Sequence, residues 1–198
     1  MKITVAALAG ACRADHRTRV LPIPLPRPLS LYHALPSDAA AYSRVAAETY
    51  FEAYNDTADS ANMAVHLARE YGELQQRREL EDPAIAVLAA REPDGEWAGF
   101  VALRRGSIAE GVHTERPIEI LRFYVRGRWH GLGAAQLLMR AAVAHAESAG
   151  HDSVWLQVWE HNARARRFYE KCGYTAVGTN PFLFGDVKET DVVYLLPF

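Results

Sequence analysis

The sequence has little cysteine, no long apolar run and almost no net charge, and each absence excludes a class of protein. Its 198 residues include two cysteines, Cys12 and Cys172, so neither a disulfide scaffold nor a thiolate metal site is predicted. Its apolar stretches fall well short of the roughly 20 residues that span a bilayer. Its 22 Lys and Arg against 24 Asp and Glu give a formal charge of −2, so no broad nucleic-acid surface is expected.

The composition of the chain is typical of an ordinary folded domain. Hydrophobic residues make up 49% of the chain and charged residues 23%, which excludes a disordered or collagen-like chain. The length suits one domain, since single domains run to roughly 100–200 residues. The eight histidines include no H-E-x-x-H or comparable spacing, so no metal site is predicted.

The first thirty residues differ from the rest. Lys2 precedes a short apolar run that ends at Cys12, which is a weak signal-peptide pattern; a simple N-terminal extension is the interpretation we prefer. Prolines then alternate with other residues from Pro22 to Pro28, which predicts an extended segment. We therefore expect a Pro-rich, flexible extension at 1–30 and one folded domain at 31–198.

From Leu31 onward, helical and strand patterns alternate. Strands are predicted at 31–35, 84–90, 97–104, 117–125, 154–159, 174–179 and 192–196. Helices are predicted after an N-cap at Ser37, around 63–74, at 134–149 and at 163–172. This order indicates an α/β or α+β fold with a mixed sheet.

The most informative segment is the glycine loop, which we define as Arg126 to Gly133. It joins the predicted strand at 117–125 to the long helix that begins near Ala134. Glycines let the backbone turn sharply at such a junction, and the first amides of a helix lack internal acceptors at the positive end of its dipole. The segment therefore predicts a pyrophosphate-binding site.

Three pyrophosphate ligands are common enough to weigh. A nicotinamide dinucleotide is disfavoured, because Gln136 stands where the third glycine of G-x-G-x-x-G is needed. A nucleoside triphosphate is disfavoured because no Gly-Lys-Ser/Thr sequence follows the loop. Coenzyme A is the remaining ligand of wide use.

Two motifs then identify a family. The segment from Arg128 to Gly133 resembles the R/Q-x-x-G-x-G/A signature of the GNAT N-acetyltransferase superfamily. The segment from Asn162 to Tyr174 resembles the family's N-x-x-A-x-x-F/Y-Y-x-K-x-G-F/Y motif, and 154–158 resembles its fifth strand. The resemblance covers 31–198 and implies a mixed, mostly antiparallel sheet whose splayed central strands are flanked by helices. The tail from Gly185 to Asp191 is similar to the polyamine N-acetyltransferase branch.

The resemblance also implies where acetyl-CoA is held. Pantetheine lies between the fourth and fifth strands and bonds the backbone of Phe123, Tyr124 and Val125 like an added strand. One of these amides polarises the thioester carbonyl. Asn162 contacts the pantetheine arm or fixes its loop. The pyrophosphate is held by residues of the glycine loop and of the following helix, namely Arg128, His130, Gly131, Leu132, Gly133, Ala134 and Ala135.

Two side chains are candidates for catalysis. A primary amine has a pKa of about 10.4, so a base near the acceptor helps at neutral pH, and Glu119 is our candidate, acting through water. The competing interpretation pairs Glu119 with Arg104 or Arg122 as a structural carboxylate. Tyr169 stands at the family's position for the acid that protonates the leaving thiolate; its alternative role is packing beside Phe168.

The predicted function is acetyl transfer from acetyl-CoA to a primary amine of a small molecule or peptide, by direct attack in a ternary complex. The alternative is a catalytically silent CoA-binding sensor or interaction module. Acidic and aromatic residues near 48–54 suit a cationic acceptor, or form an ordinary amphipathic helix. We expect no metal, no nucleic-acid partner and no membrane span, and a cytoplasmic location where acetyl-CoA is found. A homodimer, common in the family, is left open.

Overall fold

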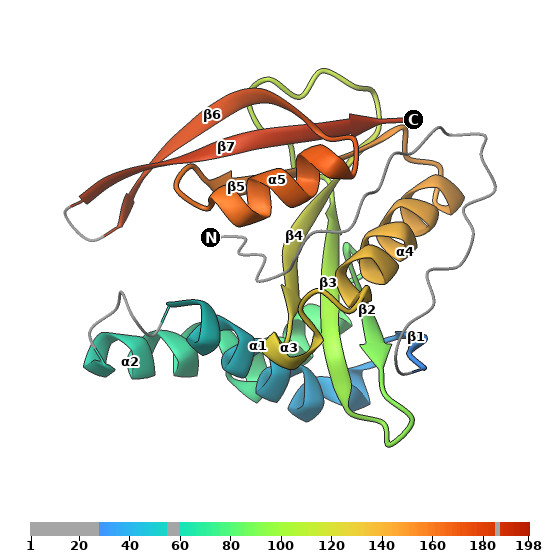
Figure 1. Cartoon of the computed structure of the whole chain (residues 1–198), viewed down its shortest axis with the longest axis vertical. Coiled ribbons are helices and arrows are strands. Elements are labelled where there is room, and N and C mark those ends of the chain that lie inside the picture. The colour runs from blue at the N-terminus through green and yellow to red at the C-terminus, as the bar shows by residue number, and fades with distance from the viewer. Residues whose placement is uncertain (1–27, 55–59, 185–186) are drawn as a thin grey trace.

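The structure is a computed structural model that describes residues 28–54, 60–184 and 187–198 (Figure 1). Its strands are β1 (Ser30–His33), β2 (Ile85–Arg91), β3 (Trp97–Arg105), β4 (Pro117–Val125), β5 (Ser153–Trp159), β6 (Thr175–Phe184) and β7 (Val187–Pro197). Its helices are α1 (Ala39–Tyr54), α2 (Ser60–Tyr71), α3 (Glu73–Glu81), α4 (Ala134–Ser148) and α5 (Ala163–Lys171), with short 3₁₀ helices η1 (Pro36–Asp38) and η2 (Gly127–Trp129).

The seven strands form one mixed sheet in the order β1-β2-β3-β4-β5-β7-β6. Every neighbouring pair is antiparallel except β4 and β5, which run parallel. The predicted fold class, a mostly antiparallel mixed sheet flanked by helices, is confirmed. A β-bulge interrupts the β3–β4 pairing, where Ala102 pairs with Arg122 but Leu103 pairs with Ile120, so that Leu121 is the extra residue.

Helices cover both faces of the sheet (Figure 1). Helices α4 and α5 pack on one face over alternate residues of the central strands, among them Val101, Ile120 and Phe123. Helices α1 to α3 pack on the other face over Phe100 and Tyr124. Since successive strand residues point to opposite faces, both sides of β4 are buried and its side chains alternate between two cores.

A buried ion pair fixes β4 to α3. Arg122 and Glu79 are in contact, and their side chains are 1% and 8% exposed. The hydroxyl of Tyr42 in α1 also donates to Glu79 at 3.1 Å. Since removing one partner would leave a buried charge, this pair strongly specifies how β4 sits against the helices.

Two local predictions were wrong. Ser37 is not an N-cap, because it lies inside η1, and the carboxylate of Asp38 instead accepts the amide of Leu35 at 2.8 Å. The helix predicted around 63–74 is two helices that meet at Gly72, where an added Cβ would lie 2.5 Å from the carbonyl oxygen of Ala68. Leu74 consequently lies in α3, and it is 62% exposed.

The predicted extension at 1–30 lies outside the described residues except for 28–30, and so does Cys12. β1 begins at Ser30. The boundary at residue 30 stays a prediction.

Candidate functional site

The central strands β4 and β5 pair over only part of their length. The ladder runs from Pro117 beside Ser153 to Ile120 beside Leu156 and stops there. Both strands continue, to Val125 and Trp159, without pairing with each other. We call the space between 121–125 and 157–159 the β4–β5 gap; it is the splay that the family resemblance implies.

The backbone of β4 offers alternate residues to this gap. Arg126 donates its amide to Ala98 of β3 at 2.9 Å, and Tyr124 stands opposite Phe100. Because bonded and non-bonded pairs alternate in an antiparallel ladder, Tyr124 is bonded to β3, whereas the amides and carbonyls of Phe123 and Val125 point toward the gap. Phe123 and the amide of Val125 therefore can bond a ligand strand, whereas the carbonyl of Val125 contacts His130 at 2.8 Å. Tyr124 instead places its ring against α1 and α2.

The glycine loop has the backbone that a phosphate site needs. Gly131 and Gly133 have φ of 75° and 90°, conformations that favour glycine. The amides of His130 and Leu132 donate to carbonyls within the loop, at 3.0 and 3.3 Å. In an α-helix the first amides have no intrahelical acceptors, so Ala134 and its neighbours at the start of α4 are the donors best placed for an anion.

On one side, the β2–β3 hairpin holds the loop. The carboxylate of Glu92 accepts from Arg128 and from the indole Nε1 of Trp129, the latter at 3.1 Å. Burial alone would raise the pKa of Glu92, but these two hydrogen bonds hold it below its ordinary value. Arg128 thus fixes the loop through Glu92.

On the other side, α1 holds the loop. Glu52 accepts the amide of Gly127 at 2.9 Å. Glu48 pairs with the buried guanidinium of Arg126 at 2.7 Å, and Glu96 of the hairpin contacts the same guanidinium at 3.2 Å. The two acidic residues considered for a cationic acceptor are therefore engaged with the loop. Sequence reasoning missed these anchors, because Glu52 lies 75 residues from Gly127 and no local pattern links them.

His130 connects the loop to the end of β4. Its Nε2 lies 2.8 Å from the carbonyl oxygen of Val125, and because a carbonyl only accepts, Nε2 carries the hydrogen. Burial lowers the pKa of His130, and the guanidinium of Arg164 lowers it further. The neutral imidazole thus donates a hydrogen bond that fixes the C-terminal end of β4.

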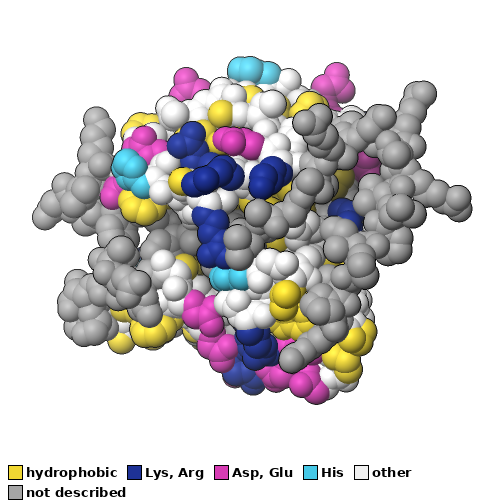
Figure 2. All heavy atoms as spheres, viewed as in Figure 1, with side chains coloured by type: hydrophobic (Ala, Val, Ile, Leu, Met, Phe, Trp, Pro, Cys, Tyr) yellow, Lys and Arg dark blue, Asp and Glu magenta, His cyan; other side chains and the backbone are white. Residues whose placement is uncertain are grey.

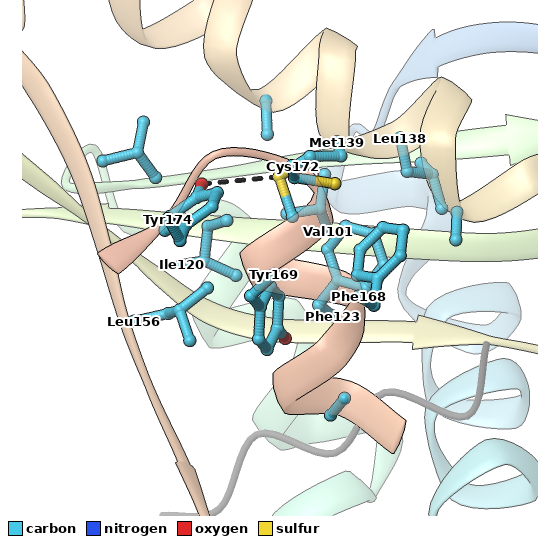
Figure 3. Packing of buried hydrophobic residues seen from close by; sticks show 14 of the residues in the cluster. Val101, Ile120, Phe123, Leu138, Met139, Leu156, Phe168, Tyr169, Cys172 and Tyr174 are labelled. Atoms are coloured by element: carbon cyan, nitrogen blue, oxygen red, sulfur yellow. Dashed lines mark hydrogen bonds between the residues drawn. The ribbon is translucent and has the colours of Figure 1, made fainter. Parts of the chain in front are cut away.

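Tyr169 lies in the core beside the gap. It belongs to the same buried cluster as Phe123 and Leu156, and Figure 3 shows its ring between these two residues. Its hydroxyl points away from Met139, which is the partner of the Tyr174 hydroxyl (Figure 3). The ring also packs at 5.7 Å from that of Phe168, so the packing considered as its alternative role is present as well.

Glu119 lies in the paired half of β4, two residues before the bulge. Its side chain is 6% exposed, and its Oε2 receives Arg104 at 2.7 Å and the hydroxyl of Ser107 at 2.6 Å. The pairing with Arg104 considered as an alternative is therefore present, whereas Arg122 pairs with Glu79 instead. Because both contacts fall on one oxygen, the carboxylate keeps Oε1 for another partner.

Helix α5 begins beside the gap. Asn162 is its N-cap, and its side-chain oxygen accepts the amide of Ala165 at 3.0 Å. Asn162 thus fixes the start of α5, and its amide nitrogen remains a donor. Figure 2 shows Lys and Arg side chains gathered over α5, where Arg164, Arg167 and Lys171 are exposed. This charge favours an anionic ligand on the same face.

No group of three or more His, Cys, Asp or Glu in the described part of the chain is arranged to hold a metal ion. Within the same residues, no helix is long and apolar enough to cross a membrane.

A parallel strand pair that opens beside a glycine loop at a helix start is an arrangement that can hold an extended thioester. Comparison with known proteins identifies it. The model of the acetyltransferase (GNAT) family matches residues 46–174, which include the gap, the loop and α5. The chain belongs to this family, and it is an N-acetyltransferase.

Relatives and solved structures agree with this assignment. A Mycobacterium tuberculosis protein named as an uncharacterized N-acetyltransferase is 34% identical over 157 residues, which cover 79% of this chain and 96% of that protein. A Lactobacillus delbrueckii subsp. lactis protein with a similar name is 26% identical over 78% of this chain and 88% of its own. The fold is shared with a PaiA N-acetyltransferase from Thermoplasma acidophilum in complex with coenzyme A (TM-score 0.69, 18% identity, 86% of this chain and 99% of that one).

Proposed function

We propose that this enzyme transfers an acetyl group from acetyl-CoA to a primary amine of a small molecule or peptide, in a ternary complex without a covalent enzyme intermediate. The observation that carries the proposal is the β4–β5 gap, whose inner edge presents the backbone of Phe123 and Val125 beside the glycine loop. A pantetheine arm has two amides, which match such an edge as an added strand would.

The loop and the start of α4 bind the diphosphate. Gly131 and Gly133 permit close approach, Ala134 and Ala135 offer helix N-terminal amides, and Arg128 with His130 keep the loop in shape. Exposed Arg164 and the other cations of α5 add favourable charge.

Two side chains handle the protons. Glu119 accepts, through water, the proton that the attacking ammonium must lose, and Arg104 with Ser107 fixes its orientation. The nitrogen then bonds to the thioester carbonyl carbon, whose oxygen is stabilised by an amide of Phe123 or Val125. As the carbon–sulfur bond breaks, the hydroxyl of Tyr169 donates its proton to the leaving thiolate, and the second proton of the attacking nitrogen returns through water to Tyr169, which restores the hydroxyl and leaves a neutral amide.

A panel of amines tests the proposal. Polyamines, amino acids, aminoglycosides and short peptides are incubated with acetyl-CoA, and release of free thiol is followed together with CoA binding by calorimetry. We expect thiol release with at least one class. Binding of CoA without thiol release from any amine would favour the silent CoA-binding module instead.

The location is proposed from the co-substrate. Acetyl-CoA is a metabolite of the cytoplasm, so we propose that the enzyme works there. Acceptors in the polyamine class, and a homodimer, are further proposals that the amine panel and analytical ultracentrifugation test.

A further inference from the structure

A second cavity lies at the opposite end of the sheet from the glycine loop. It has a volume of about 300 Å³ and is bounded by the end of β1, the starts of β2 and β4, the end of β3 and the last turn of α4. β4 rises by about 3.3 Å per residue, so its nine residues place this cavity roughly 25 Å from the loop. The acetyl-transfer chemistry does not use it.

Its ionisable lining residues are all basic or imidazole. His33 comes from β1, His145 from α4, His151 from the turn after α4, and Arg105 from the end of β3. The rings of His33 and His145 have centroids 6.0 Å apart. We call this the histidine cavity.

Part of the lining of the histidine cavity is apolar. It is formed by Ile85, Leu103, Ile118 and Ala149. Basic and aliphatic side chains in one lining are the combination by which small-molecule sites fix a ligand of mixed character.

The carboxylates next in sequence to the lining residues Pro83 and His151 have partners elsewhere. Asp152 accepts the amides of Glu115 and Arg116, each at 3.0 Å. Asp82 accepts the amide of Ala84 at 2.8 Å. Glu115 and Arg116 line a neighbouring cavity of about 460 Å³ rather than this one.

We propose that the histidine cavity binds a small organic anion, with its carboxylate between His33, His145 and Arg105 and its apolar part on Leu103 and Ile118. A metal ion is not the ligand we infer, because these side chains form no metal-holding group within the described residues. The carbonyls that end α4 accept the amides of Ala149, Gly150 and His151, which reduces their repulsion of an anion.

Binding is coupled to protonation. Burial lowers the pKa of His145, and the neighbouring His33 and His151 lower it further. A bound carboxylate favours the charged imidazole, so binding takes up a proton and strengthens as pH falls.

Isothermal titration calorimetry of the full chain tests this with benzoate, its neutral isostere benzamide, and inorganic phosphate, at pH 6.0 and 7.5. We expect benzoate to bind about tenfold more tightly than benzamide, and more tightly at pH 6.0, since one good charge interaction is worth about that factor. Two buffers of different ionisation enthalpy measure the proton uptake.

Variants locate the site. H145Q and R105Q should each weaken benzoate binding several-fold, whereas H161Q, at an exposed position outside the cavity, should not. CoA binding checks the fold, and R105Q provides the test if H145Q does not fold, because Arg105 is exposed. Equal affinities for benzoate and benzamide, phosphate binding as tight as benzoate, no saturable binding at millimolar concentration, or unchanged affinity in both variants would overturn the proposal.

Discussion

β4 and β5 run side by side as an ordinary parallel ladder up to Ile120 and Leu156, and beyond these residues they separate. Each strand nevertheless keeps its outer neighbour along its full length, β3 for β4 and β7 for β5. The bulge at Leu121 redirects β4 where the separation begins. In the closed half, up to Ile120 and Leu156, the facing backbone groups of β4 and β5 bond each other. In the open half, beyond these residues, they are left for a ligand. Ligand binding is therefore expected where the two parts of the sheet diverge.

The largest effect should come from the proton donor beside the open half. Y169F removes the hydroxyl and should lower kcat by about 100-fold, since general acid catalysis contributes roughly 10²–10⁴. CoA affinity, measured by calorimetry, should change by less than about twofold, because the ring and its packing are kept. Y174F is the matched control, since its hydroxyl in the same cluster contacts the sulfur of Met139 at 3.4 Å. Equal losses in both variants would show that packing, not proton transfer, is affected.

The next effect concerns the loop that opens onto the gap. G133V places a β-branched residue at φ 90°, which costs on the order of 2 kcal/mol. Because the free loop relaxes to relieve this strain and must return to its original conformation to bind, CoA binding should weaken about 30-fold. G106V carries the same conformational cost at φ 79° in open space far from the loop. It should lower Tm without changing the Kd for CoA. A similar Kd change in both variants would mean that the loop is not the phosphate site.

A smaller effect is expected in the closed half. E119Q should lower kcat/KM about tenfold at pH 7.5, and the loss should shrink toward pH 10, where an amine of pKa about 10.4 is increasingly neutral without help. R104Q removes the ion-pair partner but keeps the carboxylate, so its loss should stay below about threefold. A loss in E119Q that does not depend on pH would assign Glu119 a structural role.

The smallest effect tests how the loop is held. E92Q removes the acceptor of Arg128 and Trp129 and should raise the Kd for CoA about threefold, roughly the value of one partly exposed charged hydrogen bond. The pKa of Glu92 is held below its ordinary value of 4.5. In the unaltered enzyme the effect of its two hydrogen bonds on CoA affinity is therefore complete above pH 4.5, and it is lost as the pH falls through the lowered pKa. In E92Q the Kd for CoA should not change over the same pH range. The control E147Q, at an exposed position, should show the same pH dependence of Kd as the parent enzyme.

Sequence periodicity and glycine placement were enough to predict most elements. The strand at 117–125 and the helix starting at Ala134 are found where the pattern put them, because long apolar periodicities and helix-ending glycines act locally. The break at Gly72 was not predicted, because a single glycine does not by itself show that its backbone is extended, at φ −62° and ψ 151°, or that a side chain there would meet the carbonyl of Ala68. The cap at Ser37 was wrong because Pro36 to Asp38 form η1, so Ser37 lies inside a helical turn rather than before one.

The amino-acid sequence by itself determined the family, the order of the elements and the motifs of the loop and of α5, since each of these depends on residues within one turn or one strand. The tertiary structure alone decided which groups are engaged: that Arg128 binds Glu92, that Glu52 binds Gly127, and that Phe123 and Val125 rather than Tyr124 face the gap. These depend on which strand lies beside β4 and on contacts across as many as 75 residues of chain, which no local pattern encodes.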